Sequence, residues 1–373
     1  MRRSSRPSWP YPPSAWSASS NAWPCHGAEA DRPGRERARG DQGRQRQAAA
    51  RSAHAGRIVA ACGVRRFMIE RPASILLRIP HASRPGGDAA TFLRVAREAE
   101  DAGFDGVVVP DHVVMGKRPD RYPWGTFAEQ PDAPFLEPFV MLAAIAAVTD
   151  RIRLTTGILI APLRPAALLA KAAATLDVIS GGRLELGVAT GWQQEEYPAV
   201  GRDWDDRDQL LTDTVAACRA LWTSSPASFA SSTVTFSDVY SEPRPVQAHG
   251  PAVLFSTGLS ATDVDRIVRL GVGWIVPLAS SREVLVEGTA ILREAFATAQ
   301  RDPGTLRIRA HSVARQNRDR GPRFAESLEA IPQQASDGAT EVSVPMADFV
   351  RDQDDITPWF TEARRELSRA GWC

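Results

Sequence analysis

A histidine and an aspartate stand together directly after a predicted buried strand, and such a pair can move a proton. The strand is Gly106–Pro110, and Asp111 and His112 follow it. Imidazole gives or takes a proton near neutral pH, so His112 is the natural general acid or base, and Asp111 could orient or charge its ring. An aspartate that caps a helix beside a solvated histidine is the other interpretation, and the pair alone does not separate the two.

A glycine interrupts a strand that is otherwise rich in β-branched residues. The stretch 152–160 reads IRLTTGILI, with Thr156, Gly157 and Ile158 at its centre. A glycine inside a strand indicates a bulge or a close approach of the backbone to a ligand. A bulge that serves only the curvature of the sheet is an equally good interpretation.

The following strand runs into small residues, a tryptophan and two carboxylates. Thr190, Gly191 and Trp192 come first, with Glu195 and Glu196 just behind. They would make one wall of a pocket for a flat ring, because tryptophan stacks well on planar heterocycles. A tryptophan that only covers the rim of the fold is the alternative.

A third strand end offers hydroxyl and backbone N–H groups ahead of a predicted helix. Ser256, Thr257 and Gly258 stand there. Donors of this kind at a helix N-terminus are what a phosphate requires. Ordinary capping of the helix by Ser260 or Thr262 explains the same pattern, and taken alone this simpler interpretation is favoured.

Other positions are weaker candidates for a functional site. The stretch Ser180–Arg183 precedes a strand and is interpreted as structural, whereas His81 and His311 each follow a strand and could line a site or lie in an exposed loop. No spacing of Asp, Glu, His or Cys builds a metal site, and we expect none. The chain also lacks a GxSxG elbow and a Walker loop, which removes the usual hydrolase and NTPase interpretations.

The elements that must position these residues alternate regularly between strand and helix. The predicted strands are 75–79, 106–110, 152–160, 183–189, 252–256, 272–277, 306–310 and 341–344. A predicted helix follows each strand, at 92–104, 138–149, 165–179, 207–222, 261–270, 284–300, 324–334 and 357–370, and a hairpin is predicted around 232–238. Apolar strands that alternate with helices form a parallel sheet buried on both faces.

Eight such units favour a (β/α)₈ TIM barrel. A doubly wound sheet would normally open with a glycine-rich turn, and Pro80–Gly87, which follows the first strand, contains no GxGxxG. In a barrel, function lies at the C-terminal ends of the strands, which is where the candidate residues stand.

Together these strand ends resemble the bacterial luciferase-like monooxygenase superfamily, in particular its branch of oxidoreductases that use the deazaflavin coenzyme F420. The stretches that carry the resemblance are Ala99–Asp105 running on to Asp111 and His112, then Leu176–Leu184, and Gly187–Trp192 with Glu196 and Gly201 behind.

The resemblance implies a (β/α)₈ barrel, expected as a homodimer, whose mouth holds a flavin-type ring. His112 with Asp111 would handle the proton beside the ring, and a non-proline cis peptide would fall at Gly157–Ile158. The cofactor-binding residues would be Thr156, Gly157, Ile158, Thr190, Gly191, Trp192, Ser256, Thr257 and Gly258. The implied function is hydride transfer between F420 and a small organic substrate. The alternative is an FMN-dependent monooxygenase that uses molecular oxygen.

Several positions depart from the family pattern. Ala189 and Thr257 stand where the family commonly has glycine, and Val272 stands where it often has aspartate. Trp192 occupies the position at which the sugar-phosphate dehydrogenases of this branch carry a glutamate, which argues against a sugar-phosphate substrate.

Composition separates the chain into two parts. Its 373 residues are 43% hydrophobic and 24% charged, which is the composition of a globular protein. The net charge of +1 argues against a nucleic-acid binder. Residues 1–67 nevertheless hold thirteen Arg, no Lys and four acids, a net of +9 that leaves −8 for the rest. This first part lacks any sustained helical or strand period, so we expect it to be disordered. We interpret it as an over-extended gene start, with Met68 as the true initiator.

The remaining observations concern the cellular compartment in which the protein is expected. Four scattered cysteines do not form a disulfide framework, which favours a reducing compartment. No apolar run approaches the roughly eighteen residues of a membrane span, and no secretory signal is found. We therefore expect a cytoplasmic barrel over residues 68–373 with no membrane partner.

Overall fold

Eight parallel strands close into a barrel in the computed structural model, which describes residues 71–80, 88–127, 129–312 and 323–372. The strands are β1 (Ser74–Arg78), β2 (Gly106–Val109), β3 (Arg153–Ile160), β4 (Leu184–Ala189), β7 (Ala252–Phe255), β8 (Gly273–Ile275), β9 (Arg307–His311) and β10 (Glu341–Pro345). Their order around the barrel is β1-β10-β9-β8-β7-β4-β3-β2, and β1 pairs with both β10 and β2. The last strand therefore pairs with the first, so this sheet has no open edge.

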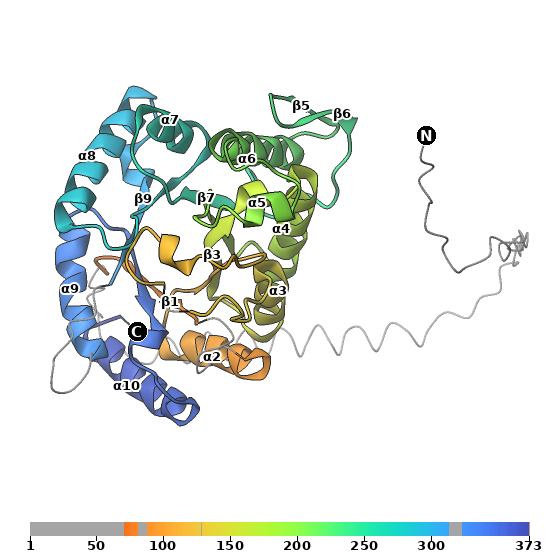
Figure 1. Cartoon of the computed structure of the whole chain (residues 1–373). Helices are drawn as coiled ribbons and strands as arrows, with labels where there is room; N and C mark the ends of the chain where they lie inside the picture. Colours follow the sequence, from red (N-terminus) through yellow and green to blue (C-terminus); the bar gives the residue numbers. More distant parts are fainter. Residues whose placement is uncertain (1–70, 81–87, 128, 313–322, 373) are drawn as a thin grey trace, which may run out of the picture. The chain divides into compact units, whose positions relative to one another are not determined.

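A helix follows each barrel strand, and Figure 1 shows these helices arranged around the strands. The helices are α2 (Ala89–Ala102), α3 (Pro138–Val148), α4 (Ala166–Ser180), α6 (Arg207–Thr223), α7 (Ala261–Leu270), α8 (Arg282–Thr298), α9 (Phe324–Ser336) and α10 (Ile356–Arg369). The predicted (β/α)₈ barrel is confirmed.

The helix boundaries follow local chemistry that is visible in the sequence. The Asp88 carboxylate accepts a hydrogen bond from the Thr91 N–H at 3.0 Å and starts α2. Gly103, with φ of 100°, ends the same helix in a left-handed conformation, and Gly181 does the same for α4 at 67°. Because a β-carbon makes this conformation costly, glycine stands at the C-terminal end of each of these two helices.

Side chains alternate between the two faces of each barrel strand. Along β1, Ile75 and Leu77 belong to the hydrophobic core that also includes Phe92 and Val95 of α2. This core fills the layer between strands and helices. Since successive residues of a strand point to opposite faces, the residues between them point to the barrel interior.

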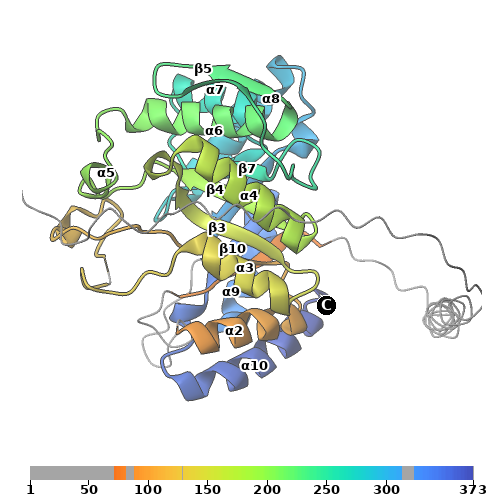
Figure 2. The same ribbon diagram turned by 90° about the vertical axis from the view of Figure 1, so that its right-hand side faces the viewer.

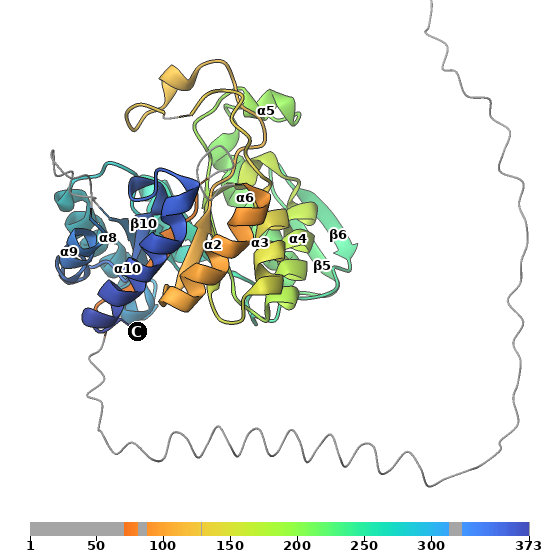
Figure 3. The same ribbon diagram turned by 90° about the horizontal axis from the view of Figure 1, so that it is seen from below.

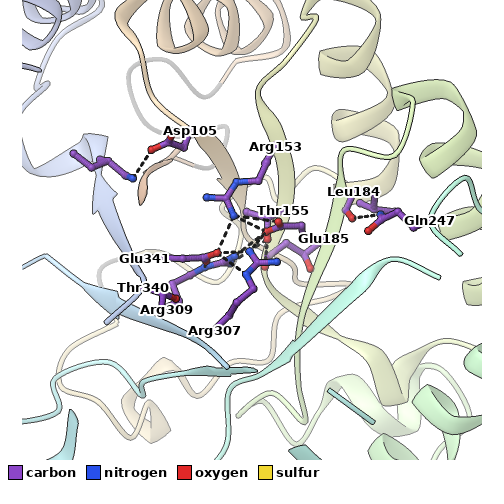
Figure 4. A network of polar contacts seen from close by, with 12 residues as sticks. Asp105, Arg153, Thr155, Leu184, Glu185, Gln247, Arg307, Arg309, Thr340 and Glu341 are labelled. Carbon is purple, nitrogen blue, oxygen red and sulfur yellow. Dashed lines mark hydrogen bonds and ion pairs between the residues drawn. The ribbon is translucent and has the colours of Figure 1, made fainter. Parts of the chain in front are cut away.

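The interior at the N-terminal end of the barrel is filled by charged side chains, which Figure 4 shows in detail. Arg153, Arg307 and Arg309 converge on Glu185 and Glu341. Arg309 Nε donates to Glu341 Oε2 at 2.8 Å, and Arg307 Nη2 donates to Glu185 Oε2 at 2.8 Å. Arg153 Nη1 donates to Glu341 Oε1 at 2.8 Å. This interior network closes one end of the barrel and leaves the other end for a site.

Several short elements depart from the simple alternation. A two-stranded antiparallel sheet of β5 (Ala227–Ala230) and β6 (Thr235–Val239) confirms the predicted hairpin, and α5 (Glu196–Ala199) follows β4. Short 3-10 helices are η1 (Pro119–Arg121), η2 (Ala161–Leu163), η3 (Pro303–Thr305), η4 (Met346–Asp348) and η5 (Gln353–Asp355). Figures 2 and 3 show α5 and the segment that leads from β2 to α3 together at one end of the barrel.

Two predictions fall outside the residues that the structure describes. They are the disorder of residues 1–67 and the placement of His81. Within the described ranges, none of the helices combines the length and the apolar character needed to span a membrane.

Candidate active site

A cavity of about 990 Å³ opens at the C-terminal ends of the barrel strands. Its walls include Arg78 at the end of β1, Gly157 in β3, Ala189 at the end of β4 and Ser256 just after β7. This is the end of a TIM barrel at which catalytic sites are built. The predicted site residues, apart from Thr156, all line this cavity.

His112 is held in the cavity wall by Glu196 of α5. Nδ1 of the ring lies 3.1 Å from Glu196 Oε2, and the two side chains are 10% and 1% exposed. The other carboxylate oxygen, Oε1, accepts the backbone N–H of Val113 at 2.8 Å. A carboxylate that accepts from Nδ1 leaves Nε2 as the nitrogen that can exchange a proton with a ligand.

Asp111 does not orient the His112 ring, contrary to the interpretation from sequence. Its carboxylate accepts the Ile160 N–H at 2.9 Å and two hydrogen bonds from the Arg164 guanidinium, at 2.7 and 3.0 Å. These bonds engage both oxygens of the Asp111 carboxylate, whereas the His112 ring is paired with Glu196. Asp111 instead ties the end of β2 to the end of β3.

Three aromatic rings contact His112 and a fourth packs on two of them; together they are called the aromatic collar: Phe127, Phe135, Trp192 and Tyr122. The ring of Phe135 lies 4.8 Å from that of His112, and Trp192 lies 5.9 Å from it at an interplanar angle of 83°. Phe127 and Tyr122 pack on Trp192 at 5.0 and 5.2 Å. The collar makes a largely apolar wall, against which a flat ring or an apolar substrate can pack.

The bulge predicted in β3 is present, and the Gly157–Ile158 peptide bond is cis. The pairing register with β4 shifts between Thr156 and Leu159. A β-carbon on Gly157 would lie 2.1 Å from Val108 Cγ1, so glycine is required for this close approach. Gly157 and Ile158 line the cavity as predicted.

Thr156 lies away from the cavity. Its side chain is fully buried, and Oγ1 donates to the Gly187 carbonyl at 2.9 Å. It therefore links β3 to β4. Its assignment as a cofactor contact is not supported by this position, because Thr156 is not among the residues that line the cavity.

The end of β4 supplies a small-residue wall. Thr190 and Gly191 lead to Trp192, and the Tyr197 hydroxyl donates to the Thr190 carbonyl at 2.6 Å. Gly191 has φ of 75° and packs against Ile160, whose atoms would be 3.1 Å from an added β-carbon. These contacts hold the chain so that Trp192 joins the collar.

The end of β7, which pairs with β4, supplies Ser256, Thr257 and Gly258 to the cavity wall. Ser260 accepts the Asp263 N–H at 3.2 Å and caps α7, so the simpler capping interpretation is confirmed for this residue. Thr257 Oγ1 is buried without a hydrogen-bond partner among the described residues. A buried hydroxyl in this state is suited to a ligand atom, because an unmet hydrogen bond is costly.

The residues present fit a planar redox cofactor with a polar tail. The aromatic collar offers stacking surface in the cavity wall, and Thr257 offers there a hydroxyl without a partner among the described residues. No group of three His, Cys, Asp or Glu side chains that could hold a metal occurs within the described ranges.

Several cavity residues were not found from the sequence. The collar residues Tyr122, Phe127 and Phe135 lie in a loop whose conformation no local pattern predicts. Arg207, whose guanidinium lies 4.4 Å from the Trp204 ring centre, also lines the wall. Arg78 did leave a signal, because it is a charged residue at the end of the apolar strand SILLR.

His311 has a structural role. It is the last residue of β9, and its Nε2 donates to the Val276 carbonyl at 2.9 Å. Burial lowers the pKa of His311 to about 3, so the ring is neutral. It does not line the cavity.

Comparisons with known proteins place this geometry in context. The luciferase-like monooxygenase family matches residues 69–321. An uncharacterised protein of Mycobacterium tuberculosis is 34% identical over 278 residues, which are 73% of this chain and 92% of the relative. The solved structure of monooxygenase RslO1 from Streptomyces bottropensis is similar with a TM-score of 0.62 at 20% identity, over 79% of this chain and 98% of that one.

An F420-dependent secondary alcohol dehydrogenase, solved in complex with an F420–acetone adduct, is similar with a TM-score of 0.60 at 17% identity. The likeness covers 79% of this chain and 99% of that one. At these identities the two solved structures show a shared fold.

Proposed function

Because the chain belongs to the luciferase-like monooxygenase family, we propose that it is an oxidoreductase that transfers a hydride between coenzyme F420 and a small organic substrate. The observation that carries the proposal is the His112 ring, held by Glu196 at 3.1 Å in the wall of a cavity at the barrel mouth. A histidine in such a position can exchange a proton with a bound reactant.

The cofactor and the protein residues have separate roles in the proposed reaction. When bound, F420 supplies the hydride chemistry at the C5 carbon of its deazaflavin ring. His112 holds or releases the accompanying proton at Nε2, because Nδ1 faces the Glu196 carboxylate. Gly157 and Ile158 bound the slot from β3, and the collar excludes water from the reacting centre.

The tail of the cofactor would lie towards β7. Thr257 Oγ1 has no hydrogen-bond partner among the described residues and is the natural donor to a tail oxygen. Arg207 is a cation in the same cavity. Trp192, which stands where a related group of enzymes has a proton-donating glutamate, supports a substrate other than a sugar phosphate.

The second candidate is an FMN-dependent monooxygenase. It is favoured by the description of the family and by the likeness to monooxygenase RslO1. The same cavity and the same histidine serve both candidates, so the difference lies in which cofactor binds.

Titration of the full-length chain with F420 and with FMN tests the proposal. Trp124 and Trp192 line the cavity, so ligand binding should quench tryptophan fluorescence. We expect F420 to bind at least about tenfold more tightly than FMN, a difference of roughly 1.4 kcal/mol. Tight binding of FMN with no response to F420 would overturn the cofactor assignment in favour of the second candidate.

A conservative pair of variants tests the position of the cofactor. Thr257→Val keeps the shape of the side chain and removes the unmatched hydroxyl, so cofactor binding should weaken by about three- to tenfold. Thr361→Val, on the exposed side of α10, is the matched control and should leave binding unchanged. Equal affinities in the two variants would remove Thr257 from the site.

A further inference from the structure

Arg78 is a cavity arginine whose guanidinium makes no direct ion pair or hydrogen bond among the described residues. It is the last residue of β1, lines the cavity and is partly buried. Within the part of the chain that the structure describes, Asp348 and Tyr122 act on its charge only electrostatically, without a hydrogen bond. Burial lowers the pKa of Arg78, which is the effect expected for a cation short of compensating charge. Arginine nevertheless stays protonated, with five N–H donors to offer.

The other arginines in the cavity wall already have partners. Arg121 Nη1 lies 3.5 Å from Glu195 Oε1 at the rim. Arg207 donates to the Trp204 carbonyl at 3.0 Å and also lies over the Trp204 ring. Arg78 therefore differs from both in having its donors available to a ligand.

Two neighbours shape the surroundings of Arg78 without pairing with it. Asp348 and Tyr122 both line the cavity and are near enough to interact electrostatically with the guanidinium. Among the described residues, neither makes an ion pair or hydrogen bond with Arg78. Asp348 lies in η4, after β10, and is exposed at the rim. One cation with a carboxylate nearby suits a ligand that carries a single negative charge better than a phosphate dianion.

Arg78 stands on the far side of the barrel from the proposed cofactor tail. In the strand order β1-β10-β9-β8-β7-β4-β3-β2, β7 lies four strands from β1 in either direction. Thr257 follows β7 and Arg78 ends β1, so the two lie on opposite sides of the cavity. A single chemical group of a ligand cannot contact both residues. A cofactor whose tail lies at Thr257 therefore leaves Arg78 available to the substrate.

We propose that Arg78 binds the carboxylate of an organic acid substrate whose apolar body packs against the aromatic collar. The planar guanidinium fork matches a carboxylate with two parallel hydrogen bonds. Tyr122 belongs to the collar and is also a neighbour of Arg78, so the cationic and apolar parts of the wall are continuous. This inference rests on the proposed function for the placement of the cofactor, and it names the class of substrate.

Binding of a matched acid and amide tests this inference. Phenylacetate and phenylacetamide have the same shape and differ in charge, and their dissociation constants can be measured by calorimetry on the full-length chain, with and without saturating F420. We expect wild-type protein to bind phenylacetate at least about tenfold more tightly. Arg78→Gln should reduce that ratio to about one, whereas Arg78→Lys, which keeps the charge without the fork, should keep part of it.

Two further variants separate a specific contact from a general effect of charge or folding. Asp348→Asn removes a repulsive carboxylate, so it should strengthen phenylacetate binding by about two- to fivefold. Arg121→Gln removes a cavity arginine that is already paired and should leave the acid-to-amide ratio unchanged. Misfolding would weaken phenylacetate binding in both variants. Opposite effects of Arg78→Gln and Asp348→Asn on that binding would therefore not arise from misfolding.

Separate outcomes decide the two proposals. If wild type shows no preference for the acid, or binds neither probe, or keeps its preference in Arg78→Gln, the inference is overturned. It is also overturned if Arg78→Gln weakens F420 or FMN and leaves phenylacetate unaffected, because Arg78 would then bind the cofactor. If neither cofactor binds while the acid preference depends on Arg78, the proposed function fails and the acid site stands.

Discussion

The chemistry available to His112 depends on which of its ring nitrogens carries a proton. Glu196 lies 84 residues further along the chain and meets Nδ1 through Oε2. Its other oxygen is occupied by the Val113 and Val114 N–H groups. The carboxylate is thus anchored by the same segment whose side chain it orients. This arrangement fixes the tautomer and directs Nε2 to a reactant.

Replacement of His112 by Ala should separate proton transfer from binding. We expect turnover to fall by about 10²- to 10⁴-fold, the usual contribution of a general acid or base. The dissociation constant of the cofactor should change much less, because the ring makes only one wall of the cavity. Steady-state kinetics and cofactor titration measure the two effects. Unchanged turnover would remove His112 from the mechanism.

Replacement of Glu196 by Gln should reverse the His112 tautomer. If the amide oxygen keeps the bonds to the Val113 and Val114 N–H groups, the amide NH₂ faces Nδ1. Nδ1 must then accept, which places the ring proton on Nε2. Nitrogen NMR of ¹⁵N-histidine-labelled protein reports the tautomer directly. The same tautomer in wild type and variant would show that Glu196 does not set it. Glu195→Gln, at the exposed rim, is the matched control.

Residue types at strand ends were predictable, whereas their partners were not. The positions of His112 and Gly157 followed from strand patterns and from the rule that barrel sites lie at C-terminal ends. The pairing of His112 with Glu196 depends on how two loops fold against each other, and the sequence suggested its neighbour Asp111 instead. Arg78 was overlooked because its strand reads as apolar, although a charge at the end of such a strand is the signal for an inward-pointing group.

At the level of elements, β3 combines a bulge with close packing against β2. A β-carbon at position 157 would lie 2.1 Å from Val108 Cγ1. Gly157→Ala should therefore destabilise the protein by about 1–3 kcal/mol through overpacking. Val108→Ala removes the opposing methyl group, so the double variant should recover part of the loss. Chemical unfolding measures all three proteins.

A second glycine provides the control for this experiment. An added β-carbon on Gly258 would have its nearest neighbour at 3.6 Å, which is ordinary contact. Gly258→Ala should therefore leave the free energy of unfolding within about 0.5 kcal/mol of wild type. Additive losses from Gly157→Ala and Val108→Ala would contradict the predicted clash.

The interior network joins four strands by charge. Burial alone would raise the pKa of Glu341, but Arg309, Arg307 and Arg153 outweigh burial and hold that pKa well below its usual value of 4.5. A depressed carboxyl pKa contributes stability that is complete above the unfolded-state value and is lost as pH falls towards the folded-state value. The network should therefore stabilise the barrel at neutral pH and less so in acid.

Glu341→Gln tests this pH dependence. Removal of one buried charge leaves three arginines facing Glu185 alone, which should cost about 3–5 kcal/mol at pH 7. The difference from wild type should shrink as the pH falls from about 4.5 to 3, because wild-type Glu341 loses its advantage there. Urea unfolding at several pH values measures the difference. Glu287→Gln on the exposed face of α8 is the control. A difference that is constant with pH would show that the ion pairs contribute nothing specific.

For the whole molecule, the alternation of strand and helix was enough to predict the barrel. Parallel strands buried on both faces need apolar runs with helices between them, and eight such units close without edges. The strand order and the closing pair β1–β10 then follow from topology. The segment from 111 to 137 and α5 were beyond prediction, because their conformations depend on packing around His112 and Trp192 rather than on a local period.

Barrel closure yields a prediction about the start of the domain. Ser74 pairs with Glu341, and Leu76 pairs with Gly106, so β1 joins the first and last parts of the barrel. A chain shortened to residues 68–373 keeps this strand and should match the full chain in Tm and in cofactor affinity. A chain that begins at residue 80 lacks β1, leaving β10 and β2 with unpaired edges, and should not fold cooperatively. Thermal unfolding and cofactor titration of the three proteins test the boundary. Loss of stability or cofactor binding in the 68–373 chain would show that residues before 68 contribute to the barrel.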